Sequence, residues 1–336
     1  MRAAALLALF LLVGCVGGGV SSLPSDPTLS PAGSARIGRD TLIAEDGARL
    51  PMRIWVPAGP IKAAVLAVHG FNDYSNAFTG PAEEWAKAGI ITYAYDQRGF
   101  GLAPERGRWA GTRRLAEDLT LASHLVRARH PKVPLFLLGE SMGGALIIAD
   151  VAGTAGAPPP DYDGIILSAP AVWGRPDMNI FERVALWTAY QLMPGMTLSG
   201  RGLHIMPSDN IPMLRALSKD PLVIKETRVD AVKGLVDLMD LALGSAPRLK
   251  APLLLLYGEH DPIIPAKPIR EMIAQLPARA AAMRRIAWYP GGYHMLMRDL
   301  DGPTVIGDVE SWIIDPAAPL PSGADRHGEG LLARGE

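Results

Sequence analysis

The feature that most constrains the fold of this chain is a short stretch near its middle, where the apolar run 135–138 leads into Gly139-Glu-Ser141-Met-Gly143. A second, helix-favouring apolar run covers residues 145–151. Gly-x-Ser-x-Gly between a strand and a helix is typical of a nucleophile elbow, a tight turn that presents a serine hydroxyl. Glycines flank the serine because Cβ atoms there would collide with the neighbouring strand and helix. Among 36 glycines the pattern could arise by chance, but its strand–turn–helix setting favours a nucleophilic Ser141.

Strand and helix patterns alternate on both sides of this turn. An antiparallel hairpin is expected around Asp46-Gly47, and helical spacing of apolar residues is clearest at 112–130. This alternation predicts an α/β fold with a mostly parallel eight-stranded sheet and helices on both faces. Predicted strands, largely apolar as suits strands buried on both faces, lie at 63–70, 89–96, 163–170, 252–258 and 285–290.

One long segment interrupts the alternation. Residues 172–225 separate two predicted strands by more than a crossover helix requires, so we expect a helical cap inserted into a core of 39–171 and 226–315. The cap is rich in large apolar side chains. Most should pack the cap onto the core, and a minority should line a substrate pocket, because ligand pockets are mainly apolar. The side chains are Trp173, Met178, Phe181, Trp187, Tyr190, Leu192, Met193, Met196 and Met206.

Residues 1–15 have the pattern of a bacterial lipoprotein signal peptide. Arg2 precedes an apolar run at 3–13, which suits a secretory h-region and is too short to span a bilayer. The run ends in Leu-Val-Gly-Cys15, which resembles a lipobox, so we expect Cys15 to carry a lipid anchor in the cell envelope. Val16, where retained lipoproteins have Asp, favours the outer over the inner membrane by the same resemblance. The alternative is a chance cysteine in a cleaved signal peptide.

Composition places limits on the remaining segments and on the partners. Residues 16–38 are rich in Gly, Ser and Pro and predict a flexible tether. Residues 316–336 combine Pro, Gly and charge without periodicity and predict a disordered tail. Cys15 is the only cysteine, which excludes an intrachain disulfide. A net charge of −1 gives no electrostatic reason to expect nucleic acid as a partner.

A nucleophilic serine requires a base, and the base requires a carboxylate that fixes its tautomer. On elbow folds the chain order is serine, acid, histidine. Of the histidines after Ser141, His204 lies in the predicted cap, His327 in the predicted tail, and His260 suits a structural role. His294 follows the last predicted strand, at the sheet edge where ligands bind. We therefore predict that His294 is the base.

The acid should follow the preceding strand, where Gly258-Glu-His-Asp261-Pro offers two carboxylates. Asp261, placed before a rigid proline, is favoured, and Glu259 is the alternative. The oxyanion formed by attack needs preoriented donors. The backbone N–H of Met142, directly after the nucleophile, is one predicted donor, and the N–H of Phe71, after the first long apolar strand, is the other. His69 beside it is expected to orient the backbone and not to act as a second base.

Five motifs, in this order, resemble those of the monoacylglycerol lipase/lysophospholipase branch of the α/β-hydrolases, with a serine aminopeptidase S33-type domain. The resemblance covers residues 42–314. It implies an α/β-hydrolase fold, an acyl-enzyme formed from a single-chain glycerolipid ester, a cap over the acyl chain, and neither a metal nor an organic cofactor. The motifs are His69-Gly-Phe-Asn-Asp-Tyr74, Tyr95-Asp-Gln-Arg-Gly-Phe-Gly101, Gly139-Glu-Ser-Met-Gly-Gly144, Gly258-Glu-His-Asp-Pro-Ile-Ile-Pro265 and Gly292-Tyr-His294.

Two other reactions stay open from the residues alone, and two further functions are disfavoured. The same catalytic residues could cleave a different ester or transfer the acyl group to an alcohol. A non-catalytic lipoprotein that binds a ligand on this scaffold would normally lack one of the three residues, and this chain has all of them. Epoxide or haloalkane chemistry would need a carboxylate in place of Ser141.

Overall fold

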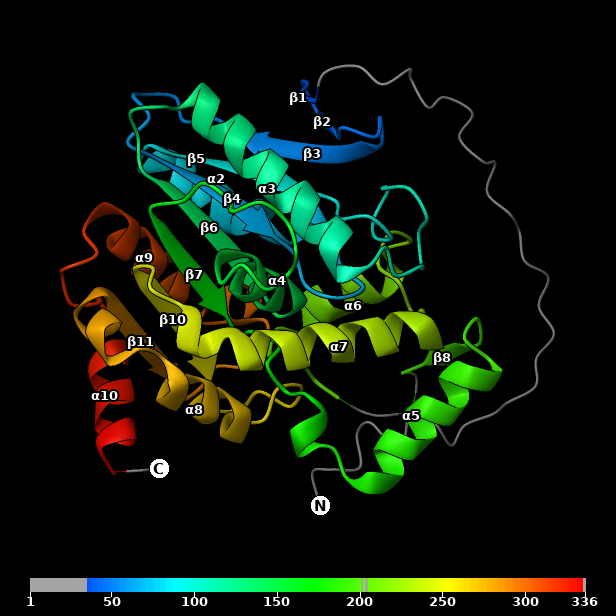
Figure 1. Cartoon of the computed structure of the whole chain (residues 1–336). Coiled ribbons are helices and arrows are strands. Elements are labelled where there is room, and N and C mark those ends of the chain that lie inside the picture. Colours follow the sequence, from blue (N-terminus) through cyan, green and yellow to red (C-terminus); the bar gives the residue numbers. More distant parts are fainter. Residues whose placement is uncertain (1–34, 201, 203–204, 335–336) are drawn as a thin grey trace.

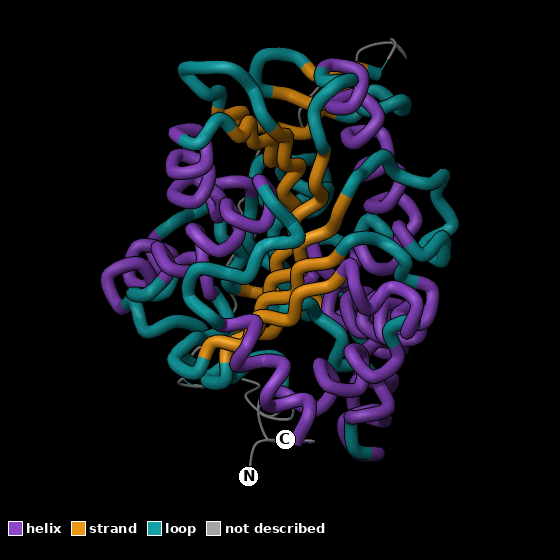
Figure 2. Tube along the Cα trace, turned by 90° about the vertical axis from the view of Figure 1, so that its left-hand side faces the viewer, coloured by secondary structure: helices purple, strands orange, loops and turns teal. Residues whose placement is uncertain are grey.

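The computed structural model describes residues 35–200, 202 and 205–334. Within them, one nine-stranded sheet forms the centre of the molecule (Figure 2). Six neighbouring strands, from β5 (Ile90–Tyr95) across to β11 (Arg284–Tyr289), run parallel to one another. The three strands beyond β5 pair antiparallel, and the one next to β5 is also antiparallel to it. In spatial order the strands are β1 (Arg36–Ile37), β2 (Thr41–Ile43), β3 (Arg49–Trp55), β5 (Ile90–Tyr95), β4 (Ala63–Val68), β6 (Leu135–Glu140), β7 (Gly164–Ser168), β10 (Leu253–Gly258) and β11 (Arg284–Tyr289).

The mostly parallel sheet is confirmed, with one strand more than predicted. The extra strand, β1, lies in the segment expected to be a flexible tether, and it pairs with β2 through Arg36 opposite Ile43 and Ile37 opposite Leu42. The side chain of Ile37 is buried, which explains why this part of the segment is ordered. The predicted signal peptide, Cys15 and the predicted tether up to residue 34 lie outside the described residues.

Helices cover both faces of the sheet, as the alternating pattern predicts (Figure 1). Successive side chains of a strand point to opposite faces, so β4 contributes Ala64, Leu66 and Val68 to one core layer and Ala63, Val65 and Ala67 to the other. The first layer is completed by α3 (Thr112–Arg129), α4 (Met142–Val151), α7 (Val229–Ser245) and α8 (Ala266–Gln275), and the second by α2 (Thr79–Lys87) and α9 (Gly302–Ile314).

The inserted cap is not purely helical. Its strand β8 (Thr197–Ser199) pairs antiparallel with β9 (Glu226–Arg228), so the cap extends three residues past the predicted boundary at 225. This small strand pair returns the chain to α7 at the edge of the core. The helical parts are the 3-10 turn η2 (Arg175–Asp177), α5 (Ile180–Leu192) and α6 (Ile211–Lys219).

The prediction that most large apolar cap residues pack the cap onto the core is wrong. Helix α5 buries one narrow face, formed by Glu182, Leu186 and Ala189, and its other faces point outward. Met178 is buried and Trp173, Tyr190 and Met196 are partly buried. The exposed side chains are Phe181, Trp187, Leu192, Met193 and Met206.

The C-terminal tail also differs from the prediction of disorder, because residues 324–334 form helix α10 (Ala324–Arg334). This helix packs closely against the edge strand β11: a Cβ at Gly328 would lie 2.3 Å from the carbonyl oxygen of Ile286. The buried Asp308 carboxylate accepts a hydrogen bond from the Ser322 N–H, which fixes the approach to the helix. An exposed sheet edge is a liability that proteins commonly cover, and a composition-based reading cannot detect this contact.

No helix within the described ranges is both long and apolar enough to cross a membrane.

Asp150, on the helix that follows Ser141, predicts a pH-dependent stability. One carboxylate oxygen accepts a hydrogen bond from Thr120 Oγ1 at 3.1 Å, and the other has no partner among the described residues. Burial raises the pKa of the Asp150 carboxyl to about 7, against a smaller lowering by the Thr120 bond. Because the folded state binds this proton more tightly than the unfolded state, the carboxyl lowers stability as pH rises from about 4 through 7.

Asp150→Asn is therefore expected to be more stable than the wild type above neutral pH, with a difference that grows by about 2 kcal/mol between pH 5 and pH 8. Urea unfolding of both proteins at these two pH values measures this difference directly, since other titrating groups are common to both. A difference that stays constant with pH would contradict an elevated pKa at this position.

Candidate active site

The serine lies on a strained turn between β6 and α4. Its backbone has φ 54° and ψ −114°, a left-handed conformation that residues other than glycine rarely adopt. Strand β6 ends at Glu140 and α4 begins at Met142. A Cβ at Gly143 would lie 2.0 Å from the carbonyl oxygen of Val68, so the turn requires glycine there. The geometry is that of the predicted nucleophile elbow.

His294 and Asp261 form a direct hydrogen-bonded pair. Nδ1 of His294 lies 2.7 Å from Oδ2 of Asp261, whose side chain is fully buried. The other carboxylate oxygen accepts hydrogen bonds from the N–H groups of Ile263 and Ile264 at 2.7 and 2.9 Å, which fix the orientation of the carboxylate. The pair forms because β10 and β11 are parallel neighbours, so the loops after them meet at one edge of the sheet.

The loops that carry the acid and the base are also joined through their backbones. The N–H of His260 donates to the carbonyl of Gly292 at 2.9 Å. The contact is close: a Cβ at Gly258 would lie 2.4 Å from the Gly292 carbonyl carbon. This approach fixes the separation of the two loops independently of the side-chain hydrogen bond.

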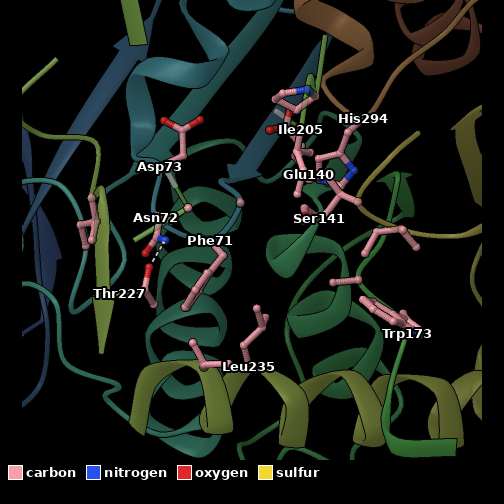
Figure 3. A pocket seen from close by; sticks show the side chains of 18 of the residues that line it. Phe71, Asn72, Asp73, Glu140, Ser141, Trp173, Ile205, Thr227, Leu235 and His294 are labelled. Carbon is pink, nitrogen blue, oxygen red and sulfur yellow. Dashed lines mark hydrogen bonds between the residues drawn. The ribbon is translucent and has the colours of Figure 1, made fainter. Parts of the chain in front are cut away.

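Ser141 and His294 line the same cavity, which has a volume of about 450 Å³ (Figure 3). Most of the remaining lining is apolar and comes partly from α7 and partly from the cap. The apolar residues of α7 recur at helical spacing in the sequence, which indicates an amphipathic helix but does not by itself place that helix at the pocket. The wall-forming side chains from α7 are Val232, Leu235, Val236 and Met239, and those from the cap segment include Trp173, Leu198, Ile205 and Ile224.

The electrostatics around His294 favour its protonated form. Burial alone would lower the pKa of the imidazole, but the neighbouring Asp261 carboxylate more than offsets this, and Glu140 adds to the effect. The pKa of His294 therefore lies above its ordinary value. A histidine that must be neutral to accept a proton loses activity below its pKa, so we expect the acid side of the pH–rate profile to be set by this group.

One predicted oxyanion donor, Met142, belongs to the elbow itself, and the other, Phe71, belongs to the loop after β4. Met142 is the first residue of α4, so its N–H is one of the helix N-terminal groups without an intrahelical acceptor. Phe71 follows β4 and lines the cavity. Between them, Gly70 permits a close approach, since a Cβ there would lie 3.3 Å from Cβ of Ser141.

The structure also separates the alternatives that the sequence left open. Glu259 lies 3.0 Å from Nε2 of His327 on α10, whereas Asp261 is the carboxylate that contacts His294. The ring of His260 packs edge-on against Tyr293. His204 lies outside the described residues.

His69 has the orienting role predicted for it. Its Nδ1 lies 2.8 Å from the carbonyl oxygen of Gly70, and its Nε2 accepts a hydrogen bond from the N–H of Gln97 at 3.0 Å. Both ring nitrogens are thus occupied by backbone groups. Burial also lowers the pKa of this imidazole, opposite to His294.

Within the described part of the chain, no three His, Cys, Asp or Glu side chains gather where they could hold a metal ion.

With this geometry in place, comparisons with known proteins identify the class. A family model described as serine aminopeptidase, S33, matches residues 59–301, and the chain belongs to this family. A monoacylglycerol lipase from Mycolicibacterium smegmatis is 26% identical over 280 residues, which cover 80% of this chain and 94% of that protein. A monoglyceride lipase from Rattus norvegicus is 27% identical over 277 residues, covering 81% and 89%.

Among solved structures, a soluble variant of monoglyceride lipase from Saccharomyces cerevisiae, in complex with a substrate analog, superposes with a TM-score of 0.68. It is 21% identical, and the match covers 87% of this chain and 99% of that one. At this identity the likeness establishes the fold alone. The predicted α/β-hydrolase fold is confirmed.

Proposed function

We propose that the protein is a serine hydrolase that cleaves the carboxylic ester of a single-chain lipid, a monoacylglycerol or a lysophospholipid, through an acyl-enzyme. The observation that carries the proposal is that the strained Ser141 and His294, which is hydrogen-bonded to Asp261, line one largely apolar cavity. A reactive group in the wall of an apolar cavity suits an ester with a long acyl chain.

The chemistry assigns one role to each residue. With Nδ1–H of His294 donated to Asp261, Nε2 is left as the basic nitrogen that takes the proton from Ser141 Oγ as the hydroxyl attacks the ester carbonyl. The N–H groups of Met142 and Phe71 receive the negative charge that develops on the carbonyl oxygen. His294 then gives the proton to the leaving alcohol as the ester C–O bond breaks. In the second half of the reaction His294 takes a proton from water, which attacks the acyl carbonyl, and gives it to Ser141 Oγ as the fatty acid is released.

The relatives support a lipid substrate. Both curated relatives reported above are named for the hydrolysis of monoacylglycerols, and each aligns over most of its length. The apolar wall of the cavity in this chain provides the independent reason, since a short, polar ester would leave it unfilled.

A substrate panel tests the proposal: monoacylglycerols and lysophospholipids of increasing acyl length against nitrophenyl acetate and butyrate, with released fatty acid measured. We expect kcat/KM for a long-chain monoacyl lipid to exceed that for the acetate by at least about tenfold, because each buried methylene adds roughly 0.8 kcal/mol. A preference for the short esters, acyl transfer to added alcohol without fatty acid release, or lipid binding without turnover would each overturn it.

We further propose that the protein is held in the cell envelope by a lipid on Cys15, in the outer rather than the inner membrane. The support is the sequence pattern of residues 1–15 and the presence of Val16 after the cysteine. Several acyl chains together give stable anchoring, whereas one chain gives only marginal binding. An anchored enzyme would meet its lipid substrate at the membrane.

Cys15→Ser is expected to move the protein from the membrane fraction to the soluble fraction while activity on a soluble ester stays unchanged. Val16→Asp provides the matched test of the destination and should shift the protein toward the inner membrane in a density gradient. A Cys15→Ser protein that stays in the membrane fraction would refute the anchor.

A further inference from the structure

We propose that Arg298 is a positioning residue of this site. Through two carboxylates, it fastens the loop after β4 that carries Phe71 (the oxyanion loop) and the nucleophile elbow around Ser141 to the loop that carries His294 (the histidine loop). The inference rests on the proposed function, because it concerns how the same hydrolytic site is held and tuned. Arg298 lies four residues after His294, in the 3-10 turn η5 (Leu296–Arg298).

Each arm of the guanidinium contacts a different segment of the site. Nη1 of Arg298 donates to Oδ2 of Asp73 at 2.7 Å, and Nη2 donates to Oε1 of Glu140. Asp73 lies two residues after Phe71, and Glu140 directly precedes Ser141. One side chain thus links the three segments that carry the base, the nucleophile and a predicted oxyanion donor.

The network is almost entirely removed from solvent. The side chains of Arg298, Asp73 and Glu140 are 10%, 9% and 4% exposed. Burial disfavours the charge of Arg298, but Glu140 and Asp73 more than offset this and hold the pKa of its guanidinium above the ordinary value. A buried arginine that bridges two carboxylates in fixed geometry is a stiff connection, because its planar donor groups match carboxylates directionally.

The partners of the network are fixed in turn. The other oxygen of Asp73 accepts a hydrogen bond from the N–H of Tyr74 at 2.9 Å. The carbonyl of Arg298 accepts a hydrogen bond from Nδ2 of the cap residue Asn210 at 3.0 Å. Glu140 lies directly beneath the oxyanion loop, since a Cβ at Gly70 would lie 3.7 Å from its Oε1. Movement of the guanidinium would therefore shift the relative positions of Ser141 and the loop that carries Phe71.

The same network tunes the base. The charged groups that act on His294 are Asp261 from the loop after β10, Glu140 from β6 and Arg298 from its own loop. Asp261 and Glu140 raise the pKa of the imidazole and Arg298 lowers it. Loss of the Arg298 charge leaves Glu140 uncompensated, and the base then stays protonated to a higher pH. Loss of the Glu140 charge has the opposite effect.

Loss of the Arg298 charge and loss of the Glu140 charge are thus expected to shift the pKa of His294 in opposite directions. The test measures kcat/KM on a soluble ester as a function of pH. For Arg298→Gln we expect the acid limb of the profile to move up by about half to one pH unit. We also expect kcat at the optimum to fall at least about tenfold, because misplaced reacting groups cost rate. For Glu140→Gln the acid limb should move to lower pH. Arg298→Lys keeps the charge but cannot contact Asp73 and Glu140 with two separate donor arms. It should therefore return the acid limb to its wild-type position and recover only part of kcat.

Arg98 supplies a matched control. Its side chain is also 10% exposed and bridges two carboxylates, Asp46 and Asp118, which do not line the cavity. Arg98→Gln should lower the thermal midpoint as Arg298→Gln does but leave the acid limb in place. If Arg298→Gln only lowers stability and neither variant of the network moves the limb, the inference is overturned. If Arg298→Gln fails to fold, the downward shift in Glu140→Gln still decides.

The Ser141→Ala protein separates this inference from the proposed function. Turnover that survives in Ser141→Ala refutes the proposed hydrolytic mechanism itself. Turnover that depends on Ser141, combined with an acid limb that is unmoved in Arg298→Gln and Glu140→Gln, refutes the role of Arg298 alone.

Discussion

Replacing Ser141 with alanine is expected to reduce kcat for ester hydrolysis by about 10⁴-fold or more while the protein stays folded. The loss is large because the alanine lacks the oxygen that forms the acyl bond, and the remaining residues can only assist a direct attack by water. The fold should persist because alanine retains the Cβ that already fits the turn beside Gly70.

Steady-state hydrolysis of a long-chain monoacylglycerol measures this loss, and labelling with a fluorophosphonate reports the nucleophile directly. Circular dichroism and the thermal midpoint check the fold. Ser218→Ala is the control, since that exposed serine on α6 does not line the cavity and, within the described part of the chain, donates to the carbonyl of Arg215. Turnover by Ser141→Ala within tenfold of the wild type would exclude the acyl-enzyme.

Replacing Asp261 with asparagine is expected to lower kcat by about 10⁴-fold. The Asp261 carboxylate accepts Nδ1–H of His294 and so keeps Nε2 free to accept a proton. An asparagine can instead present its amide N–H to Nδ1, which places the imidazole proton on Nε2 and removes the base. The backbone N–H groups of Ile263 and Ile264 that now bind Oδ1 should hold the asparagine in place.

Glu259→Gln is the matched control for this experiment, two residues away on the same loop. Its carboxylate contacts His327 on α10 and not His294, so kcat should stay within about threefold of the wild type. The two variants are compared in one assay series at a pH above the acid limb. A larger loss in Glu259→Gln than in Asp261→Asn would reverse the assignment of the acid.

Much of the site could be predicted because its signals are local. The glycines around Ser141 are dictated by a turn of a few residues, and the elbow formed where they predict it. Asp261 and His294 each follow an apolar run, and residues at the carboxyl ends of parallel strands meet at one sheet edge. Chain order therefore predicted that the two loops meet, although they are far apart in sequence, while the choice between Asp261 and Glu259 stayed open.

Other features depend on partners that no local pattern identifies. Composition predicted disorder for the stretch that contains α10, yet this helix is ordered because it covers the edge of β11. Apolar content predicted packing for Phe181 and Trp187, yet both are exposed because α5 buries only one narrow face. In each case burial is decided by what lies opposite the segment.

The sequence by itself determined the sheet, the elbow and the order of the three catalytic candidates, because hydrophobic periodicity and turn geometry act over short stretches of chain. Only the tertiary structure decided which carboxylate contacts His294, which side of α7 forms the cavity wall, and that Arg298 joins Asp73 to Glu140. Those contacts link residues far apart along the chain, and their energies depend on distance and burial, which exist only once the chain has folded.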